Sequence, residues 1–232
     1  MNITPEQQLV MDKIHEYFNE LGYHNIIIYG SYVEQFHGFD VQPNDIDVTL
    51  VIDEEPPEKR HKTFYLGFTD LPINVEIMHR KSFEGELCSM QPKYFMCICN
   101  PAIQKDIDSA FDSKLPHEVR SCISSIASKA FDKGKKKLTI EEDYDEVLGL
   151  KNICHAFKFP YYAKWKYHPG TETTKEQDIV YLNEIHRTVY ELYQNSTGTL
   201  DERCQVVLNY AKATHNSTMT GFRILFPKEV NS

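Results

Sequence analysis

Alternating apolar residues predict short strands in the first third of the chain, before wider, helical spacings take over. The run 25–29 is apolar and β-branched, which indicates a buried strand. The run 45–52 has an apolar residue at every even position, and the run 72–78 alternates in the same way. This pattern predicts a sheet that is apolar on one face.

The N-terminus carries a complete helix-start signal. Thr4 is expected to cap the helix, Pro5 to take its first position and Gln7 to complete a capping box. An apolar stripe follows at helical spacing, made of Val10, Ile14, Phe18 and Leu21.

Beyond Arg80 the pattern changes to longer helical stretches. Their expected divisions lie at Pro101, at Pro116, around Gly134, at Pro160 and near Gly198. We therefore predict an α/β (α+β) chain, with a small mixed-sheet domain over residues 1–100 and an all-helical domain over residues 101–232.

Two aspartates share one face of the strand predicted at 45–52. Because side chains alternate, Asp45 and Asp47 lie opposite the apolar face, with Cα atoms about 6 to 7 Å apart. Two carboxylates at this separation can hold metal ions. The expected ion is Mg²⁺ (or Mn²⁺), which is usually held by one or two carboxylates together with substrate phosphates. Taken alone, such a pair is also common on a solvated strand edge.

Gly30 and Ser31 stand between the first predicted strand and the next helix. Gly30 lets the backbone turn sharply, and Ser31 opens a helix whose N-terminal N–H groups suit a phosphate. Taken alone, this pair also fits an ordinary helix start with a serine cap. In sequence with the two aspartates, it points to phosphoryl chemistry.

Glu76 lies on the strand predicted at 72–78. Ile73, Val75 and Ile77 take the core face, so Glu76 falls on the opposite one. We expect it to be a third metal-binding carboxylate and a general base toward an attacking hydroxyl. A non-catalytic role for this carboxylate is the alternative.

In this order, Gly30-Ser31, Asp45-x-Asp47 and Glu76 resemble the polymerase-β-type nucleotidyltransferase superfamily. The resemblance spans the predicted sheet domain. It implies transfer of a nucleotidyl group from a nucleoside triphosphate (NTP) to a hydroxyl. It also implies that Asp45 and Asp47 bind metal and that Glu76 is the third acidic position.

Three further segments are similar to the RNA-repair-ligase-associated branch of that superfamily: 74–83, 100–101 and 151–158. In the last one, Lys151, His155 and Lys158 share one helical face. We expect the two lysines to hold triphosphate oxygens and His155 to contact the base or ribose, with the helical domain closing the nucleotide cleft. A structural role for His155 is the alternative.

The charge distribution bears on the acceptor. The net charge of −9 argues against a general attraction to nucleic acid, yet residues 114–137 hold seven basic side chains against two acidic ones. This stretch is either a site for polyphosphate or RNA backbone, or a solvated helix end.

An RNA or tRNA end is the preferred acceptor. A small-molecule hydroxyl, a protein acceptor or a non-catalytic nucleotide-binding adaptor stays open, and the sequence does not define an oligomeric state. No run is long enough to span a membrane, and no signal peptide is evident. The six cysteines lack zinc spacing. We therefore expect a cytoplasmic protein with no membrane partner.

Overall fold

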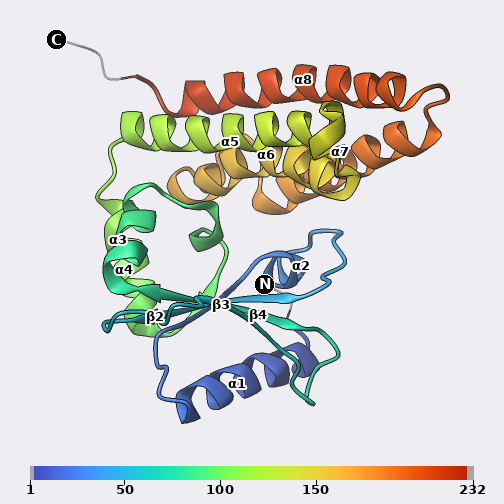
Figure 1. The fold of residues 1–232 in the computed structure, drawn as a ribbon. Coiled ribbons are helices and arrows are strands. Elements are labelled where there is room, and N and C mark those ends of the chain that lie inside the picture. The colour runs from blue at the N-terminus through green and yellow to red at the C-terminus, as the bar shows by residue number, and fades with distance from the viewer. Residues whose placement is uncertain (1–2, 229–232) are drawn as a thin grey trace. The chain divides into compact units, whose positions relative to one another are not determined.

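The computed structural model describes residues 3–228 and divides the chain into two compact units, Met1–Lys114 and Leu115–Ser232. The first contains a mixed sheet with helices, and the second contains long helices (Figure 1). The predicted fold class, a mixed-sheet domain followed by an all-helical one, is therefore confirmed. None of the helices described is long and apolar enough to cross a bilayer.

Within the described residues, the sheet has five strands in the order β3-β4-β2-β1-β5. They are β1 (Ile26–Tyr29), β2 (Ile46–Ile52), β3 (His61–Phe64), β4 (Ile73–His79) and β5 (Ile98–Cys99). β2 pairs parallel to β4 and antiparallel to β1, while β3 and β5 add antiparallel edges. The strand that carries the aspartate motif is thus central in the sheet.

The helices of the first unit are α1 (Pro5–Glu20), α2 (Ser31–Phe36), α3 (Arg80–Cys88) and α4 (Pro101–Asp112). Thr4 and Gln7 form the predicted capping box at the start of α1. Ile14 and Phe18 of the predicted stripe are buried, whereas Leu21 follows the helix and is exposed. Helix α4 belongs to this unit, although the sequence expectation placed residues after 100 in the helical domain.

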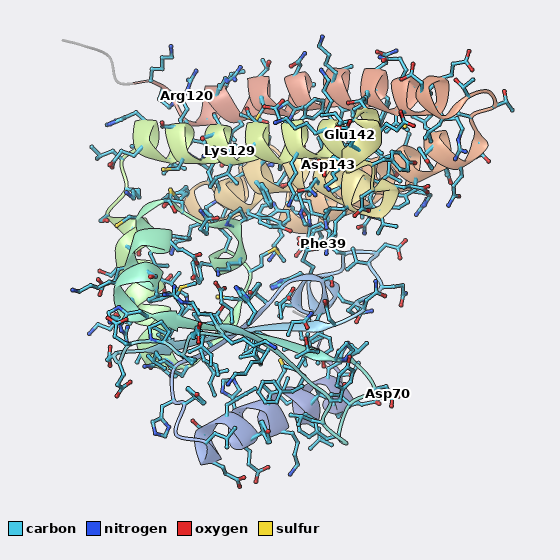
Figure 2. The ribbon with its side chains drawn as sticks, in the orientation of Figure 1. Phe39, Asp70, Arg120, Lys129, Glu142 and Asp143 are labelled. Carbon is cyan, nitrogen blue, oxygen red and sulfur yellow. The ribbon has the colours of Figure 1, made fainter. Side chains whose placement is uncertain are left out.

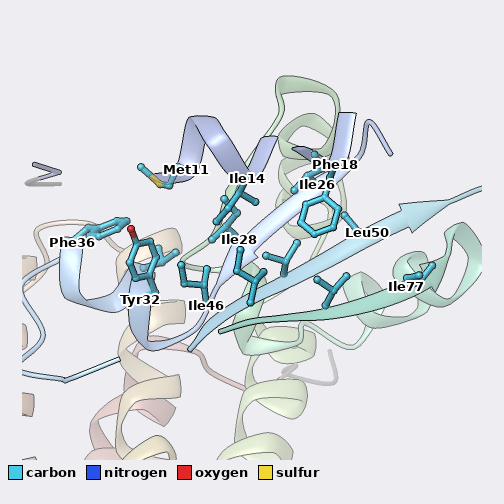
Figure 3. Close-up of a cluster of buried hydrophobic side chains, with 14 residues drawn as sticks. Met11, Ile14, Phe18, Ile26, Ile28, Tyr32, Phe36, Ile46, Leu50 and Ile77 are labelled. Atoms are coloured by element: carbon cyan, nitrogen blue, oxygen red, sulfur yellow. The ribbon is translucent and has the colours of Figure 1, made fainter. Parts of the chain in front are cut away.

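One face of the sheet forms an apolar core with α1 and α2 (Figure 3). The register pairs Val48 of β2 with Val75 of β4, so the apolar residues of both strands point to the same side. Burying each such side chain contributes about 1.5 to 3 kcal/mol. The intervening polar residues must then occupy the opposite face of the sheet.

The second unit contains α5 (Pro116–Thr139), α6 (Glu146–Tyr167), α7 (Lys175–Asn195) and α8 (Leu200–Leu225). The breaks predicted around Gly134 and at Pro160 are wrong, because both residues lie inside helices. A Cβ on Gly134 would lie 2.8 Å from the carbonyl oxygen of Gly149 on α6. Gly134 therefore allows α5 and α6 to pack closely and does not form a turn. Pro160 is tolerated in α6, where it is buried.

A buried ion pair joins α6 to α7. The ammonium group of Lys164 lies 2.9 Å from Oδ2 of Asp178, and the two side chains are only 9% and 5% exposed. The hydroxyl of Thr173 and the indole N–H of Trp165 also donate to the Asp178 carboxylate. This network satisfies charges that would otherwise be costly to bury.

Lys164→Met should lower the free energy of unfolding of the helical unit by about 3 to 5 kcal/mol, because it leaves the Asp178 charge buried without its cation. The exposed Lys212 of α8 offers a control, and Lys212→Met should change stability little. Denaturant unfolding followed by circular dichroism measures both variants. Adding Asp178→Asn to Lys164→Met should recover part of the loss. A loss of unfolding free energy below about 1 kcal/mol for Lys164→Met would contradict a buried ion pair between Lys164 and Asp178.

His215 of α8 is stacked on Phe131 of α5, with ring centroids 5.0 Å apart. Burial lowers the pKa of His215 and nearby Arg223 lowers it further, while Asp132 opposes both effects. The unfolded chain therefore takes up a proton more readily than the folded one as the pH falls below 6.5. This difference removes stability on acidification, down to the lowered pKa of the folded state.

His215→Phe should flatten the fall in thermal stability between pH 7 and pH 5, because it removes this titration and keeps an aromatic ring against Phe131. Melting temperatures of the two proteins, taken at half-unit pH steps, make the comparison. Identical slopes would show that His215 does not contribute to the acid sensitivity.

Candidate functional site

The face of the sheet opposite the core carries polar side chains from neighbouring strands. Asp47 on β2 pairs with Tyr29 on β1 and with Asn74 on β4. In the next row, Thr49 pairs with Glu76. Asp47 is half-buried, and it lies in the middle of this face.

Asp47 lies directly against the turn that starts α2. Gly30 caps this helix with φ +81° and ψ −160°, a conformation almost confined to glycine. A Cβ at this position would collide with Oδ2 of Asp47. The close approach of the carboxylate to the backbone therefore requires glycine here, which the sequence predicted only as a sharp turn.

The start of α2 offers backbone donors beside that carboxylate. The carbonyl of Gly30 accepts the first helical hydrogen bonds, from the N–H groups of Val33 (3.1 Å) and Glu34 (3.0 Å). The N–H groups of Ser31 and Tyr32 precede these and have no acceptor within the helix. They are the donors that suit an anion at this end of α2.

Asn74 orients Asp45, a role that the sequence analysis missed. Its amide nitrogen donates to Oδ2 of Asp45 at 2.7 Å, and its amide oxygen accepts from the hydroxyl of Thr63 at 2.9 Å. The available signal was alternation, because Asn74 lies two residues before Glu76 on the same strand face. Asp45 and Asp47 are thus on one face, and each has a neighbour that limits its movement.

Glu76 contacts a lysine. Nζ of Lys93, in the short helical turn Pro92–Tyr94, lies 3.2 Å from Oε2 of Glu76 and 2.8 Å from Oε2 of Glu86. Among the described residues, no three His, Cys, Asp or Glu side chains lie close enough together to hold a metal ion. The role of Glu76 as a third metal ligand stays a prediction.

Lys93 is a second site residue that the sequence analysis missed. Its side chain is 17% exposed, and its ammonium lies 5.3 Å from the ring centroids of both Tyr29 and Tyr94. Burial lowers the pKa of Lys93, but Tyr29, Glu86 and Glu76 together raise it above its ordinary value. Lys93 is therefore a fixed cation beside Glu76. No periodic pattern in the sequence marks it.

The donor chemistry of Asp45 and Asp47 fits a hard divalent cation. Both are carboxylates on one face, and Mg²⁺ is commonly held by one or two carboxylates together with substrate phosphates. The N–H groups at the start of α2 suit such phosphates. The binding of a metal ion by Asp45 and Asp47, and of phosphate at the start of α2, stays a prediction.

The other predicted nucleotide contacts lie on α6, in the helical unit. Lys151 is exposed and His155 is half-buried, with its ring 5.5 Å from that of Phe159. Lys158 is buried at 4% exposure. The role of these three residues toward a triphosphate stays a prediction.

Gly30→Ala should lower stability by about 1 to 3 kcal/mol and displace Asp47, because alanine is strained in this conformation and its methyl group overlaps the carboxylate. The displacement of Asp47 should also weaken Mn²⁺ binding, which calorimetry measures. Gly22→Ala is the matched control, since Gly22 also has a positive φ (+87°) but nothing within 4 Å of an added Cβ. Equal Mn²⁺ affinity in both variants would show that Asp47 does not depend on Gly30.

Comparisons with known proteins find only distant likeness. No protein-family model matches the chain, and a search of curated proteins finds no significant match. One solved structure that matches is a nucleotidyltransferase-like protein from Exiguobacterium sibiricum 255-15, at 13% identity and a TM-score of 0.35. That alignment covers 94% of this chain and 78% of the other. The residues of the sheet alone must therefore support a functional conclusion.

Proposed function

We propose that this chain is a metal-dependent nucleotidyltransferase that moves a nucleoside monophosphate from an NTP to a hydroxyl. One observation carries the proposal: the carboxylate of Asp47 lies against Gly30 at the start of α2, and Asp45 lies on the same face of the sheet. A carboxylate pair beside the first N–H groups of a helix combines the two features that bind a metal–triphosphate complex.

Each group on this face has a proposed part in binding. The N–H groups of Ser31 and Tyr32 bind the β and γ phosphates, and Asp45 and Asp47 hold Mg²⁺ or Mn²⁺. When bound, the metal would polarise phosphoryl oxygens and stabilise negative charge on the leaving group. Asn74 keeps Asp45 directed to this face through its hydrogen bond.

The reaction is a displacement at the α-phosphorus. The acceptor hydroxyl oxygen forms the new P–O bond, the bond to the β-phosphate bridging oxygen breaks, and pyrophosphate leaves. We propose that Glu76 accepts the proton of the acceptor hydroxyl. Glu76 lies on β4, in the row of the sheet next to the one that contains Asp47. Lys93 would then act as a positioning residue, because it holds one oxygen of Glu76.

The proposed acceptor is an RNA end. The support is the similarity of segments 74–83, 100–101 and 151–158 to RNA-repair-ligase-associated nucleotidyltransferases. A small-molecule hydroxyl or a protein side chain would use the same chemistry at the α-phosphorus. A single labelling experiment can therefore separate the acceptors.

Wild-type protein should transfer label from at least one of the four α-³²P NTPs, ATP included, into total RNA or cell lysate with Mg²⁺ or Mn²⁺ present. Asp47→Asn should reduce transfer to the background without protein, because it halves the charge of the carboxylate pair. Asp70→Asn is the matched control and should retain wild-type transfer, since Asp70 is an exposed residue of the same unit (Figure 2). Separation into RNA, protein and small-molecule fractions identifies the acceptor.

Two outcomes would contradict the proposal. Equal labelling by wild type and Asp47→Asn, with both proteins folded by circular dichroism, would remove the aspartate pair from the reaction. Metal-dependent binding of triphosphate without transfer into any fraction would favour the non-catalytic adaptor.

A further inference from the structure

A pocket of about 660 Å³ opens within the helical unit, between the first half of α5 and the C-terminal end of α8. It is lined by His117, Arg120, Ser121, Ser124, Arg223 and Lys228. No carboxylate is among these lining residues. The pocket belongs to a single unit, and the reaction proposed at the sheet does not involve it.

The lining concentrates positive charge in a chain whose net charge is −9. Arg120, Arg223 and Lys228 are permanent cations at neutral pH, and they surround one concave surface. Within the described part of the chain, neither Arg223 nor Lys228 forms an ion pair. Like charges held close together repel each other unless an anion lies between them.

Arg120 is held in place before any ligand binds. It lies near the start of α5 (Figure 2), and its Nη1 donates to the carbonyl oxygens of Arg223 at 3.1 Å and Phe226 at 3.2 Å. Both bonds use one nitrogen, and a guanidinium carries further donors on Nη2 and Nε. A fixed guanidinium loses less entropy when it binds an oxyanion.

Ser124 adds an independent sign of a ligand. His117, Arg120, Ser121 and Ser124 recur along one face of α5 at helical spacing. The hydroxyl oxygen of Ser124 is buried, and it has no hydrogen-bond partner among the described residues. A helical serine ordinarily bonds back to the preceding turn, and a buried hydroxyl without a partner is costly. Rotation of this side chain toward the pocket would bring the hydroxyl to an oxygen-rich ligand, which would supply the missing partner.

We propose that this pocket binds a phosphate group. A phosphate offers the negative charge that three cations require and several acceptor oxygens for guanidinium and hydroxyl donors. The pocket volume lies in the range of small-ligand sites, so a mononucleotide can be accommodated. The phosphate comes either from such a free phosphomonoester or from the backbone of a polynucleotide.

Binding of a 5′-fluorescein-labelled 12-nucleotide RNA to the full chain, followed by anisotropy in EDTA, tests the pocket without metal at the sheet. Arg223→Gln/Lys228→Gln should weaken binding at least tenfold and reduce the slope of log K against log salt by about 1.4, that is 2 × 0.7. Arg187→Gln/Lys212→Gln removes the same charge from exposed positions on α7 and α8, and should bind like wild type.

Calorimetry with AMP and with inorganic phosphate distinguishes the two sources. If wild type binds AMP and the pocket variant does not, the ligand is a free phosphomonoester. If RNA binds and AMP does not displace it, the ligand is a phosphate of the polynucleotide backbone. Ser124→Ala should also weaken binding of the ligand identified in this way, although the substitution changes no charge. The proposal is overturned if the pocket and control variants bind equally, or if wild type binds none of the three probes. These outcomes do not depend on nucleotidyl transfer.

Discussion

The parallel pairing of β2 with β4 is the constraint on which the sheet unit depends. Its register places Val48 beside Val75, and in the same way Asp47 beside Asn74. A slip of one residue would turn the aspartates into the apolar core and expose the residues that hold α1 and α2. Core stability and the orientation of the candidate site are therefore one property of this strand pair.

The carboxylates on the polar face have different neighbours, and this difference suggests different roles. Asp47 lies beside the backbone of Gly30, and Asp45 accepts a hydrogen bond from a neutral amide. Glu76 instead contacts the cation of Lys93. Contact with a glycine turn or a neutral amide does not neutralise a carboxylate, whereas pairing with the lysine cation leaves Glu76 with less charge to offer a metal ion. The proposed division into metal ligands and a positioned base follows from these contacts.

Much of the local structure could be predicted from the sequence. The capping box at Thr4 and the apolar face of β2 follow from residues within a few positions of each other, and both are confirmed. Gly134 and Pro160 show where this reasoning fails. Both are helix breakers by intrinsic preference, yet packing against neighbouring helices retains them inside α5 and α6.

The sequence by itself determined the periodicity of each element, and so the face on which Asp45, Asp47 and Glu76 lie. Only the tertiary structure decided their partners. The contacts of Asn74 with Asp45 and of Lys93 with Glu76 join residues 29 and 17 positions apart. The guanidinium of Arg120 donates to the carbonyl oxygen of Arg223, 103 positions away. Side-chain alternation is a local property of the backbone, whereas such contacts depend on strand register and helix packing, which no short stretch of sequence encodes.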